Sequence, residues 1–445
     1  MFQGRQLRQG LLALVLGIAT MAGAASAERI EPLPSVALFN GRDLTGWVNV
    51  NGAPSTWSVR DGMLVCSGKP SGFLRTAEMY ENYILQWECR LAAAGGNSGM
   101  FVHADALPQV GAPYPRAIEV QLLDGDHGSI FGIRGATIEP QANGDLKGGT
   151  PRARPTANRC RPAGAWNAYR LTSQNGTLEL EVNGAQVTKA SNLSQRKGYI
   201  GLQSEGSEVC FRNLRVMPLP GIAASTDKIA QADEGRRSIF DGLDFAGWQF
   251  HEAFQGHWVA QDGVVRCDGQ IRRAKGESRD LWTEREYGDF VLVADWRLTK
   301  KPEPKKLPTF TPDGMFVTSP DKKIVLRELL DAGDSGIYVR GNTRSQINIW
   351  SQPMGSGDIN DYHKDGTLPI EIRQACVPKQ HADHPPGQWN RFVITMRGDR
   401  ISVVLNGEPV IDRAVLPGVP PRGRIALQNH NDPVEFRNLF IKELD

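Results

Sequence analysis

The sequence predicts an all-β protein built from two tandem β-sandwiches. Residues 166–216 and 389–441 share a Trp-Asn start, an Asn-Gly turn, a Gly-x-Ile-x-Leu-Gln run and a closing Phe-Arg-Asn-Leu. Such recurrence indicates that one structural module occurs twice. Elsewhere the chain consists of short alternating apolar runs separated by Gly, Asn, Asp and Pro, the pattern of strands and turns. Many strands without crossover helices favour antiparallel pairing, and therefore a sandwich or a barrel.

Further matches extend the repeat over most of the chain. The run LFNGRDLTGW at 38–47 matches IFDGLDFAGW at 239–248, and NSGMFVH at 97–103 matches DSGIYVR at 334–340. These matches predict a first sandwich over 28–218, a small polar linker over 219–236 and a second sandwich over 237–445, which we call repeat one and repeat two.

Two local patterns predict particular turns and helices. Asn-Gly at 183–184 and at 406–407 joins alternating runs, which is a strong hairpin signal. Repeat two also contains a charged, Pro-rich insertion at about 300–331, and LRELLDAG at 326–333 is expected to form a short helix.

The N-terminus has the pattern of an export signal. Arg5 and Arg8 precede a short apolar run, and Ala25-Ser26-Ala27 fits a cleavage site. The run is shorter than the roughly 20 residues that span a bilayer. We therefore expect residues 1–27 to be a signal peptide, and the protein to be periplasmic or secreted. A retained N-terminal anchor is the alternative.

Charge argues against a nucleic-acid partner. The chain carries 51 Lys and Arg against 49 Asp and Glu, and removing Arg5 and Arg8 would balance them. Proteins that bind nucleic acids usually present a basic patch, and no basic run occurs here. We expect no membrane span beyond the N-terminal run, and an uncharged ligand.

Six cysteines follow the predicted cleavage site, an even number for an oxidising compartment. Their positions in the two repeats predict three bridges: Cys66–Cys160, Cys267–Cys376 and Cys89–Cys210. Free buried thiols are the alternative, because cysteine is often buried without a partner.

Period-two alternation predicts which side chains face outward from each strand. In AIEVQLLD, Ile118, Val120 and Leu122 should face the core, while Glu119 and Gln121 face outward. The same reasoning collects a polar face in each repeat. In repeat one it adds His103, Gln203 and Glu205; in repeat two it gives Asp295, Tyr338, Arg340, Asn348, Trp350, Gln428 and His430.

Amides, acids and aromatic rings on one sheet face suit a carbohydrate. Amides have fixed donor and acceptor directions for sugar hydroxyls, and flat rings contact the C–H faces of sugars. An ordinary solvated sheet face is the alternative. We expect a sugar ligand, oxidised or plain, bound by these residues.

The motifs together resemble the 3-keto-disaccharide hydrolase domain family. They are Phe-Asn-Gly-x-Asp-Leu-x-Gly-Trp, Asn/Asp-Ser-Gly-Ile-Tyr, Glu-Val-Gln-Leu-Leu-Asp, Trp-Asn, Asn-Gly, Gly-Leu-Gln and Phe-Arg-Asn. The resemblance covers nearly all of both repeats and implies two concanavalin A-like, laminin-G-like jelly-roll sandwiches. It also implies substrates that are glycosides oxidised to a ketone at sugar carbon 3.

Such substrates can be cleaved by elimination, because the ketone acidifies the hydrogen on carbon 2. The site then needs a base, an electrophile for the ketone oxygen and an acid for the leaving oxygen. In repeat one we expect Glu119 or His127 to be the base, supported by Asp124, with His103 and Gln121 binding or polarising the sugar. The acids of LLDGDHGSIFG at 122–132 are also of the kind that binds Ca²⁺, and a simple Asp-Gly turn is a further alternative. No other cofactor is expected.

Repeat two departs from this pattern. Gln346 stands at the place of Glu119, and Asn348 at the place of Gln121. A base would have to be Asp295, His363 or His430, with Arg340 stabilising an oxyanion and Trp350 or Tyr362 stacking on a sugar. Two hypotheses follow: an exported enzyme that cleaves 3-keto glycosides in at least one repeat, or a non-catalytic protein with two lectin-like modules.

Overall fold

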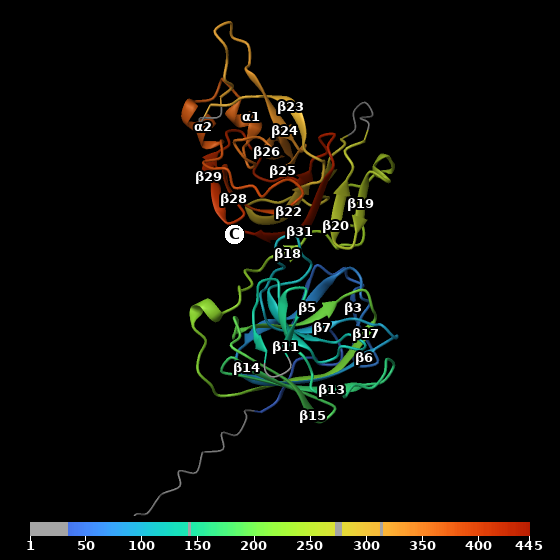
Figure 1. The fold of residues 1–445 in the computed structure, drawn as a ribbon. Coiled ribbons are helices and arrows are strands. Elements are labelled where there is room, and N and C mark those ends of the chain that lie inside the picture. The colour runs from blue at the N-terminus through green and yellow to red at the C-terminus, as the bar shows by residue number, and fades with distance from the viewer. Residues whose placement is uncertain (1–33, 141–143, 272–277, 312–314) are drawn as a thin grey trace, which may run out of the picture.

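The computed structural model describes residues 34–140, 144–271, 278–311 and 315–445 as two β-sandwiches, one stacked on the other (Figure 1). The predicted signal peptide, residues 1–27, lies outside these ranges. Helices in the described chain are short: η1 (Thr226–Lys228), η2 (Glu252–Phe254), α1 (Asn360–His363) and α2 (Ile370–Ala375). None of them is long and apolar enough to cross a bilayer.

Repeat one consists of two antiparallel sheets, which we call its back sheet and its front sheet. In spatial order, the described back sheet contains β10 (Glu139–Pro140), β15 (Ala185–Ser191), β14 (Thr177–Val182), β13 (Asn167–Gln174), β6 (Tyr83–Leu91), β17 (Val209–Pro218), β4 (Met63–Cys66) and β3 (Trp57–Arg60), with β1 (Val36–Ala37) also paired to β17. The front sheet contains β11 (Gly144–Lys147), β12 (Thr150–Ala153), β9 (Ile130–Ile133), β8 (Ala117–Gln121), β7 (Gly99–Ala104), β16 (Gly198–Ser204), β5 (Gly72–Tyr80) and β2 (Trp47–Val50).

Repeat two has the same plan with a smaller front sheet. Its back sheet contains β19 (Trp258–Gln261), β20 (Val264–Cys267), β31 (Val434–Glu443), β22 (Phe290–Leu298), β27 (Asn390–Arg397), β28 (Arg400–Leu405) and β29 (Glu408–Val415), with β18 (Arg237–Ser238) paired to β31. Its front sheet contains β21 (Leu281–Trp282), β30 (Ala426–Leu427), β25 (Asp334–Val339) and β26 (Asn342–Trp350). The insertion forms a separate hairpin of β23 (Glu303–Pro308) and β24 (Leu326–Asp331).

The recurring Trp-Asn and Asn-Gly motifs brace each other in both repeats. Asn183 turns the β14–β15 hairpin at φ 49° and donates its Nδ2 to Asn167 Oδ1 at 2.9 Å. Asn406 turns the β28–β29 hairpin at φ 53° and makes the same bond to Asn390 at 2.7 Å. The predicted hairpins are therefore confirmed, and asparagine suits them because it tolerates the left-handed backbone region.

Each sandwich has its own apolar core, filled as the alternation predicts. Ile118, Val120 and Leu122 are buried in the core of repeat one. Ile347 and Ile349 are buried in the core of repeat two. The all-β class and the two tandem sandwiches are confirmed, because the sheets are antiparallel throughout the described residues.

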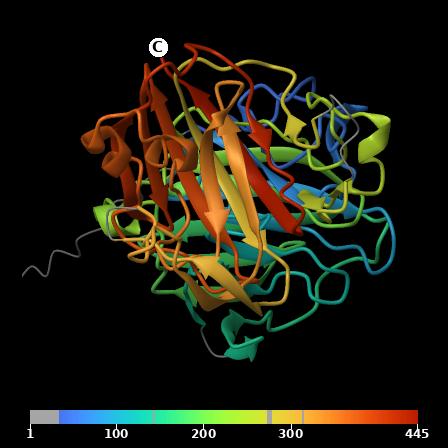
Figure 2. The same cartoon turned by 90° about the horizontal axis from the view of Figure 1, so that it is seen from above.

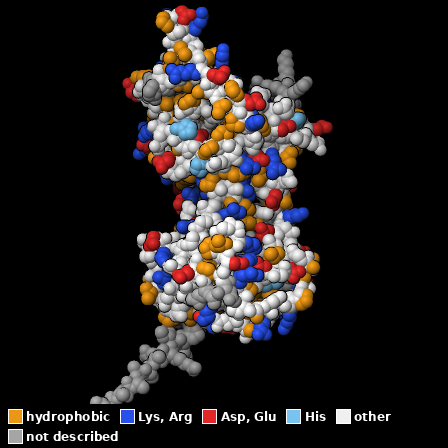
Figure 3. All heavy atoms as spheres, in the orientation of Figure 1, with side chains coloured by type: hydrophobic (Ala, Val, Ile, Leu, Met, Phe, Trp, Pro, Cys, Tyr) orange, Lys and Arg blue, Asp and Glu red, His pale blue; other side chains and the backbone are white. Residues whose placement is uncertain are grey.

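The two repeats meet front to back. The front sheet of repeat one contributes Phe73 and Phe101 to an apolar layer that Val293 and Phe440 complete from the back sheet of repeat two. Figure 2 shows the orange and red strands of repeat two lying over the blue and green strands of repeat one. In the space-filling view the two lobes join at a narrower waist, and acidic and basic side chains mingle over the visible face (Figure 3).

A buried carboxylate fastens this interface. Asp295 on β22 is fully buried, pairs with Arg391 at 2.6 Å and accepts hydrogen bonds from Gly111 N at 2.8 Å and Asn438 Nδ2 at 2.6 Å. Arg391 also donates to the Pro108 carbonyl at 3.0 Å. A buried charge needs such partners to offset its lost hydration.

Two local predictions were wrong. LRELLDAG forms the strand β24 rather than a helix, because its residues pair with β23 along the inserted hairpin. The six cysteines are free thiols, so none of the three predicted bridges is present. The sheet explains one failure: Cys89 lies opposite Phe211 and Cys210 lies opposite Arg90 in adjacent strands, so the two thiols point to opposite faces.

Candidate functional sites

The repeat-one site is built on three adjacent strands of its front sheet. On β7 and β8, Gly99 lies opposite Gln121 and Phe101 lies opposite Glu119, which places both polar side chains on the outer face. Gly99 leaves the space that they need, because a Cβ atom there would lie 2.3 Å from Glu119 Oε1. Gln203 comes to the same place from β16.

These side chains line a cavity of about 350 Å³, which we call the repeat-one cavity. Its polar lining combines carboxyl, amide and cationic groups on one side of a sheet. The residues that line it are Asn97, Tyr114, Glu119, Gln121, Phe131, Gly132, Ile133, Arg134, Lys147, Thr150, Gln203 and Glu205.

Glu119 is the most unusual titratable group of this cavity. It is 3% exposed, and its Oε1 has no hydrogen-bond partner. Burial, and then the neighbouring charge of Glu205, raise the pKa of Glu119 from 4.5 to about 8. Gln203 Oε1 is also buried without a partner, next to Glu119 above Gly99. If Glu119 is protonated, its hydroxyl can donate a hydrogen bond to Gln203 Oε1, which would give both oxygens a partner.

Asn97 connects the remaining polar groups of the repeat-one cavity. It accepts a hydrogen bond from Gln121 Nε2 at 2.8 Å and donates one to Glu205 Oε2 at 2.7 Å. Burial is the main cause of a raised pKa at Glu205. Lys147 and Arg134 also line the cavity and supply positive charge, and the Lys147 ammonium lies 5.4 Å from the centroid of the Phe131 ring.

The histidines predicted for repeat one lie elsewhere. His127 is buried, and its Nδ1 lies 2.8 Å from the hydroxyl of Tyr169, a core residue on β13. Asp124 accepts a hydrogen bond from Gly95 N at 2.9 Å and so holds a loop. Neither residue lines the repeat-one cavity.

The prediction that His103 faces outward was wrong. Its backbone has φ 52°, which breaks the alternation of β7 and turns the side chain into the sandwich. There Nδ1 lies 3.0 Å from the Gln195 carbonyl and Nε2 lies 3.1 Å from Ser173 Oγ. Burial lowers the pKa of His103 to about 4, so the ring is neutral.

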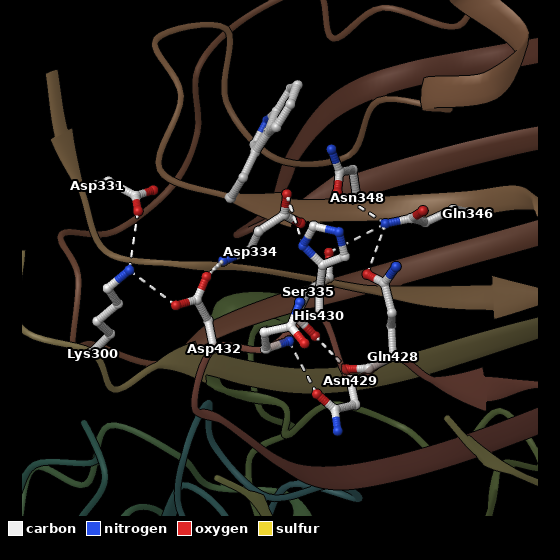
Figure 4. Close-up of polar contacts among 12 residues, drawn as sticks. Lys300, Asp331, Asp334, Ser335, Gln346, Asn348, Gln428, Asn429, His430 and Asp432 are labelled. Carbon is white, nitrogen blue, oxygen red and sulfur yellow. Dashed lines mark hydrogen bonds and ion pairs between the residues drawn. The ribbon is translucent and has the colours of Figure 1, made fainter. Parts of the chain in front are cut away.

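Repeat two reproduces this architecture with different side chains (Figure 4). Gly336 lies opposite Asn348, and Tyr338 lies opposite Gln346, in the register of repeat one. Gln346 Nε2 donates to Gln428 Oε1 at 2.9 Å, and Gln428 Nε2 donates to the Tyr338 hydroxyl at 2.6 Å. An amide thus occupies the position of the Glu119 carboxyl.

An Asp–His pair takes the place of Asn97 and Glu205 in repeat two. His430 Nδ1 lies 3.4 Å from Asp334 Oδ2. Burial, followed by the charge of Asp432, raises the pKa of Asp334 to about 7, while burial lowers the pKa of His430. Lys300 links Asp331 and Asp432 beside this pair at 3.1 Å and 2.9 Å (Figure 4).

These residues line a cavity of about 310 Å³, which we call the repeat-two cavity. Its lining consists of Lys300, Lys305, Leu307, Asp331, Gly333, Asp334, Trp350, Gln352, His430, Asn431 and Asp432. Of the residues predicted for repeat two, Trp350 and His430 line the cavity directly. Asn348 and Gln428 lie in the hydrogen-bonded row beside it.

Two predicted residues of repeat two have other contacts. Asp295 lies on the back sheet and in the interface, so it does not share a face with the front-sheet residues. Arg340 has φ 58°, like its counterpart His103, and is buried. Its guanidinium donates to the Pro420 carbonyl at 2.8 Å and pairs with Asp289 at 2.8 Å.

Sequence reasoning missed several groups. Asn97 belongs to the Asn-Ser-Gly motif, which was noted without a role for its first residue. Arg134 directly follows β9, and Lys147 is the last residue of β11; both lie at strand ends, where the sequence gives little periodic signal. Asp358 was also missed: it forms a buried pair at 3.5 Å with His363, which was a candidate base of repeat two, and burial raises the pKa of Asp358 to about 8.

No three His, Cys, Asp or Glu side chains are grouped to hold a metal ion within the described ranges. The acids considered for Ca²⁺ are engaged by protein groups. Asp126 pairs with Arg152 at 2.9 Å, and Asp124 accepts from the backbone of Gly95.

Comparison with known proteins places the chain in a family. The model of the 3-keto-alpha-glucoside-1,2-lyase-like domain matches residues 34–217 and again residues 235–442. The chain belongs to this family. The two matches correspond to the two sandwiches and support a glycosyl-hydrolase assignment.

Individual relatives are distant. A 3-keto-disaccharide hydrolase of Bacteroides thetaiotaomicron is 25% identical over 245 residues, covering 41% of this chain and 78% of that protein. A provisionally named glycosyl hydrolase of Parabacteroides distasonis is 24% identical, with a TM-score of 0.33 over 42% of this chain and 94% of that one. A Bacillus licheniformis β-glucanase is 14% identical, with a TM-score of 0.31 over 43% and 100%.

Proposed function

We propose that repeat one cleaves the glycosidic bond of 3-keto glycosides, with Glu119 as the base that removes the proton from sugar carbon 2. The observation that carries this proposal is the buried Glu119 carboxyl, which lines a polar cavity with one oxygen unpartnered and a pKa raised to about 8. A strongly perturbed carboxyl in a cleft is typical of a general acid or base. The family and the name of the Bacteroides relative support the substrate class.

The reaction balances without a cofactor. Glu119 takes the proton from carbon 2, and the electron pair of that C–H bond forms an enediolate with the ketone at carbon 3. The bond from carbon 1 to the leaving oxygen then breaks, and that oxygen receives a proton, for which protonated Glu119 is available. Water adds to carbon 1 and carbon 2 regains a proton, giving the 3-keto sugar and the free alcohol.

The other groups of the repeat-one cavity fit the remaining needs of this reaction. The Lys147 and Arg134 cations stabilise negative charge as it develops on the enediolate. Gln121 and Gln203 present amides to sugar hydroxyls, and Glu205 can accept hydrogen bonds from them. A carboxylate whose pKa lies near the working pH is ionised in part of the molecules and is also a strong base. A carboxylate of ordinary pKa is fully ionised but is a weaker base.

Repeat two supports the assignment to repeat one. Its residue at the position of Glu119 is Gln346, whose amide cannot accept a proton from carbon at neutral pH. The two cavities therefore differ in the group that this chemistry requires.

The test uses a 3-keto glucoside and measures release of the keto sugar. The wild-type chain should release it, and Glu119→Gln should lower kcat about 1,000-fold, within the range that a general base contributes. Glu179→Gln is the matched control, because Glu179 lies on the back sheet and pairs with Lys189 at 2.8 Å. Absence of turnover by the wild type, or full activity of Glu119→Gln, would refute the proposal.

We also propose that the protein is exported to the periplasm or beyond. Arg5, Arg8, the short apolar run and Ala25-Ser26-Ala27 support this. When the full-length sequence is expressed, the mature protein should be found outside the cytoplasm and should lack residues 1–27. A chain that stays intact in the cytoplasmic fraction would contradict the proposal.

A further inference from the structure

Repeat two has a second cavity, which shares the lining residue Trp350 with the repeat-two cavity. This cavity, which we call the aromatic cavity, has a volume of about 310 Å³. It is lined by Trp296, Leu298, Pro302, Leu330, Trp350, Ser351, His381, Asp383, His384, Pro385, Pro386, Gln388 and Asn390. Trp350 also lines the repeat-two cavity, so one side chain borders both spaces.

Trp350 is held firmly in this position. Its indole Nε1 donates to the Gly355 carbonyl at 2.7 Å, and its backbone N donates to Ser356 Oγ at 3.1 Å. The ring centroid of Phe310 lies 5.8 Å away. A fixed ring presents an aromatic surface to a ligand without losing conformational freedom on binding.

The two repeats carry different side chains at the positions that form the aromatic cavity. Trp350 comes two residues after Asn348, which lies opposite Gly336. The corresponding residue in repeat one is Leu123, two residues after Gln121, which lies opposite Gly99. Trp296 lies opposite Phe436, and its counterpart Cys89 lies opposite Phe211. The inserted hairpin provides the remaining wall through Leu330.

The two cavities differ in chemistry. Trp, Leu and Pro side chains dominate the aromatic cavity, whereas Lys, Asp and His side chains dominate the repeat-two cavity. Apolar walls favour a flat apolar group, and convergent polar groups favour hydroxyls. Each volume is at the lower end for a small-molecule site, which fits a single ring in each.

We propose that repeat two binds a glycoside with an aromatic aglycone, with the sugar beside Asp334 and His430 and the aglycone in the aromatic cavity. Trp350 lines both cavities, so a ligand that occupies both would lie beside its ring. Gln346 stands at the position of Glu119, so the cleavage proposed for repeat one is not assigned to repeat two. The proposal concerns binding alone and does not depend on turnover in repeat one.

The experiment uses the full chain with Glu119→Gln, so that binding is measured without turnover. Phenyl β-D-glucopyranoside and methyl β-D-glucopyranoside are titrated separately by calorimetry. The phenyl glucoside should bind at least tenfold more tightly than the methyl glucoside. Equal affinities would overturn the proposal. So would the absence of binding of either glucoside at a ligand concentration of about 10 mM.

Two substitutions on the exposed face of the hairpin locate the aglycone. Leu330 is 63% exposed and lines the aromatic cavity, while Leu326 is 51% exposed and lines neither cavity. Leu330→Asp should weaken the phenyl glucoside about tenfold and leave the methyl glucoside unchanged, and Leu326→Asp should change neither. An equal effect of both substitutions would place the aglycone elsewhere and refute the assignment.

Discussion

The raised pKa of Glu119 makes a quantitative prediction about stability, independent of any substrate. Its pKa lies at about 8 in the folded chain, against 4.5 for an ordinary glutamate. Because the folded-state pKa is the higher one, the folded protein binds more protons between these values. Stability therefore falls as the pH rises through this window, and the loss is complete above pH 8.

The gap between the two pKa values sets the size of the effect. Each pKa unit corresponds to about 1.4 kcal/mol, so ionising Glu119 removes up to about 5 kcal/mol of folding free energy. Glu119→Gln cannot ionise. Relative to the wild type, its free energy of unfolding should rise by several kcal/mol between pH 5 and pH 9.

Urea unfolding followed by tryptophan fluorescence at pH 5, 7 and 9 measures this difference. Glu179→Gln, which alters a carboxyl on the back sheet, should follow the wild-type profile. A constant difference between Glu119→Gln and the wild type across this pH range would show that Glu119 ionises normally. That result would remove the physical basis for its assignment as the base.

Four further predictions follow from the same contacts. Since Glu119 must be ionised to act, kcat/KM for a 3-keto glucoside should rise with pH around a midpoint near 8; a rate independent of pH from 6 to 9 would contradict this role. Lys147→Ala should lower kcat/KM about 100-fold, whereas Lys189→Ala, remote on the back sheet, should leave it unchanged. His127→Ala should reduce stability by about 2 kcal/mol, because the Tyr169 hydroxyl loses its 2.8 Å contact with His127 Nδ1. The folded fraction should keep its kcat, and a loss of kcat would show that His127 takes part in the reaction. Asp295→Ala should destabilise the chain by about 3 kcal/mol, since it leaves the partly buried Arg391 guanidinium without its carboxylate at the interface. Limited proteolysis should then cleave between the repeats.

Alternation predicted the outward residues of the repeat-one site where strands are regular. Glu119 and Gln121 alternate with Ile118 and Val120, and the backbone follows that pattern without interruption. The same reasoning failed at His103, because a single residue with positive φ reverses the side-chain direction and leaves no mark in composition.

Alternation also cannot say which sheet a strand joins. Asp295 does face away from its own core, as predicted, but it does so from the back sheet and into the other repeat. Asn97 and Lys147 were missed for a related reason: they reach the cavity from the start of a strand and from a hairpin, where no period orders the side chains. LRELLDAG shows the same limit, since pairing with β23 overrode its helical preference.

The front-to-back contact between the repeats has a consequence for assembly. An interface between two unlike surfaces can be repeated by further copies, and it stays open-ended unless the rotation between copies closes a ring. On repeat two, the surface that corresponds to Phe101 carries Tyr338, stacked on Trp282 with ring centroids 5.7 Å apart. A third repeat could dock there by the same geometry, and a chain cut back to repeat one would expose an apolar sheet that another copy could cover. Further duplication of this module could therefore build longer rods. In such a rod the back sheet of each new repeat would cover part of the front sheet of the repeat before it, and its own front sheet would stay exposed.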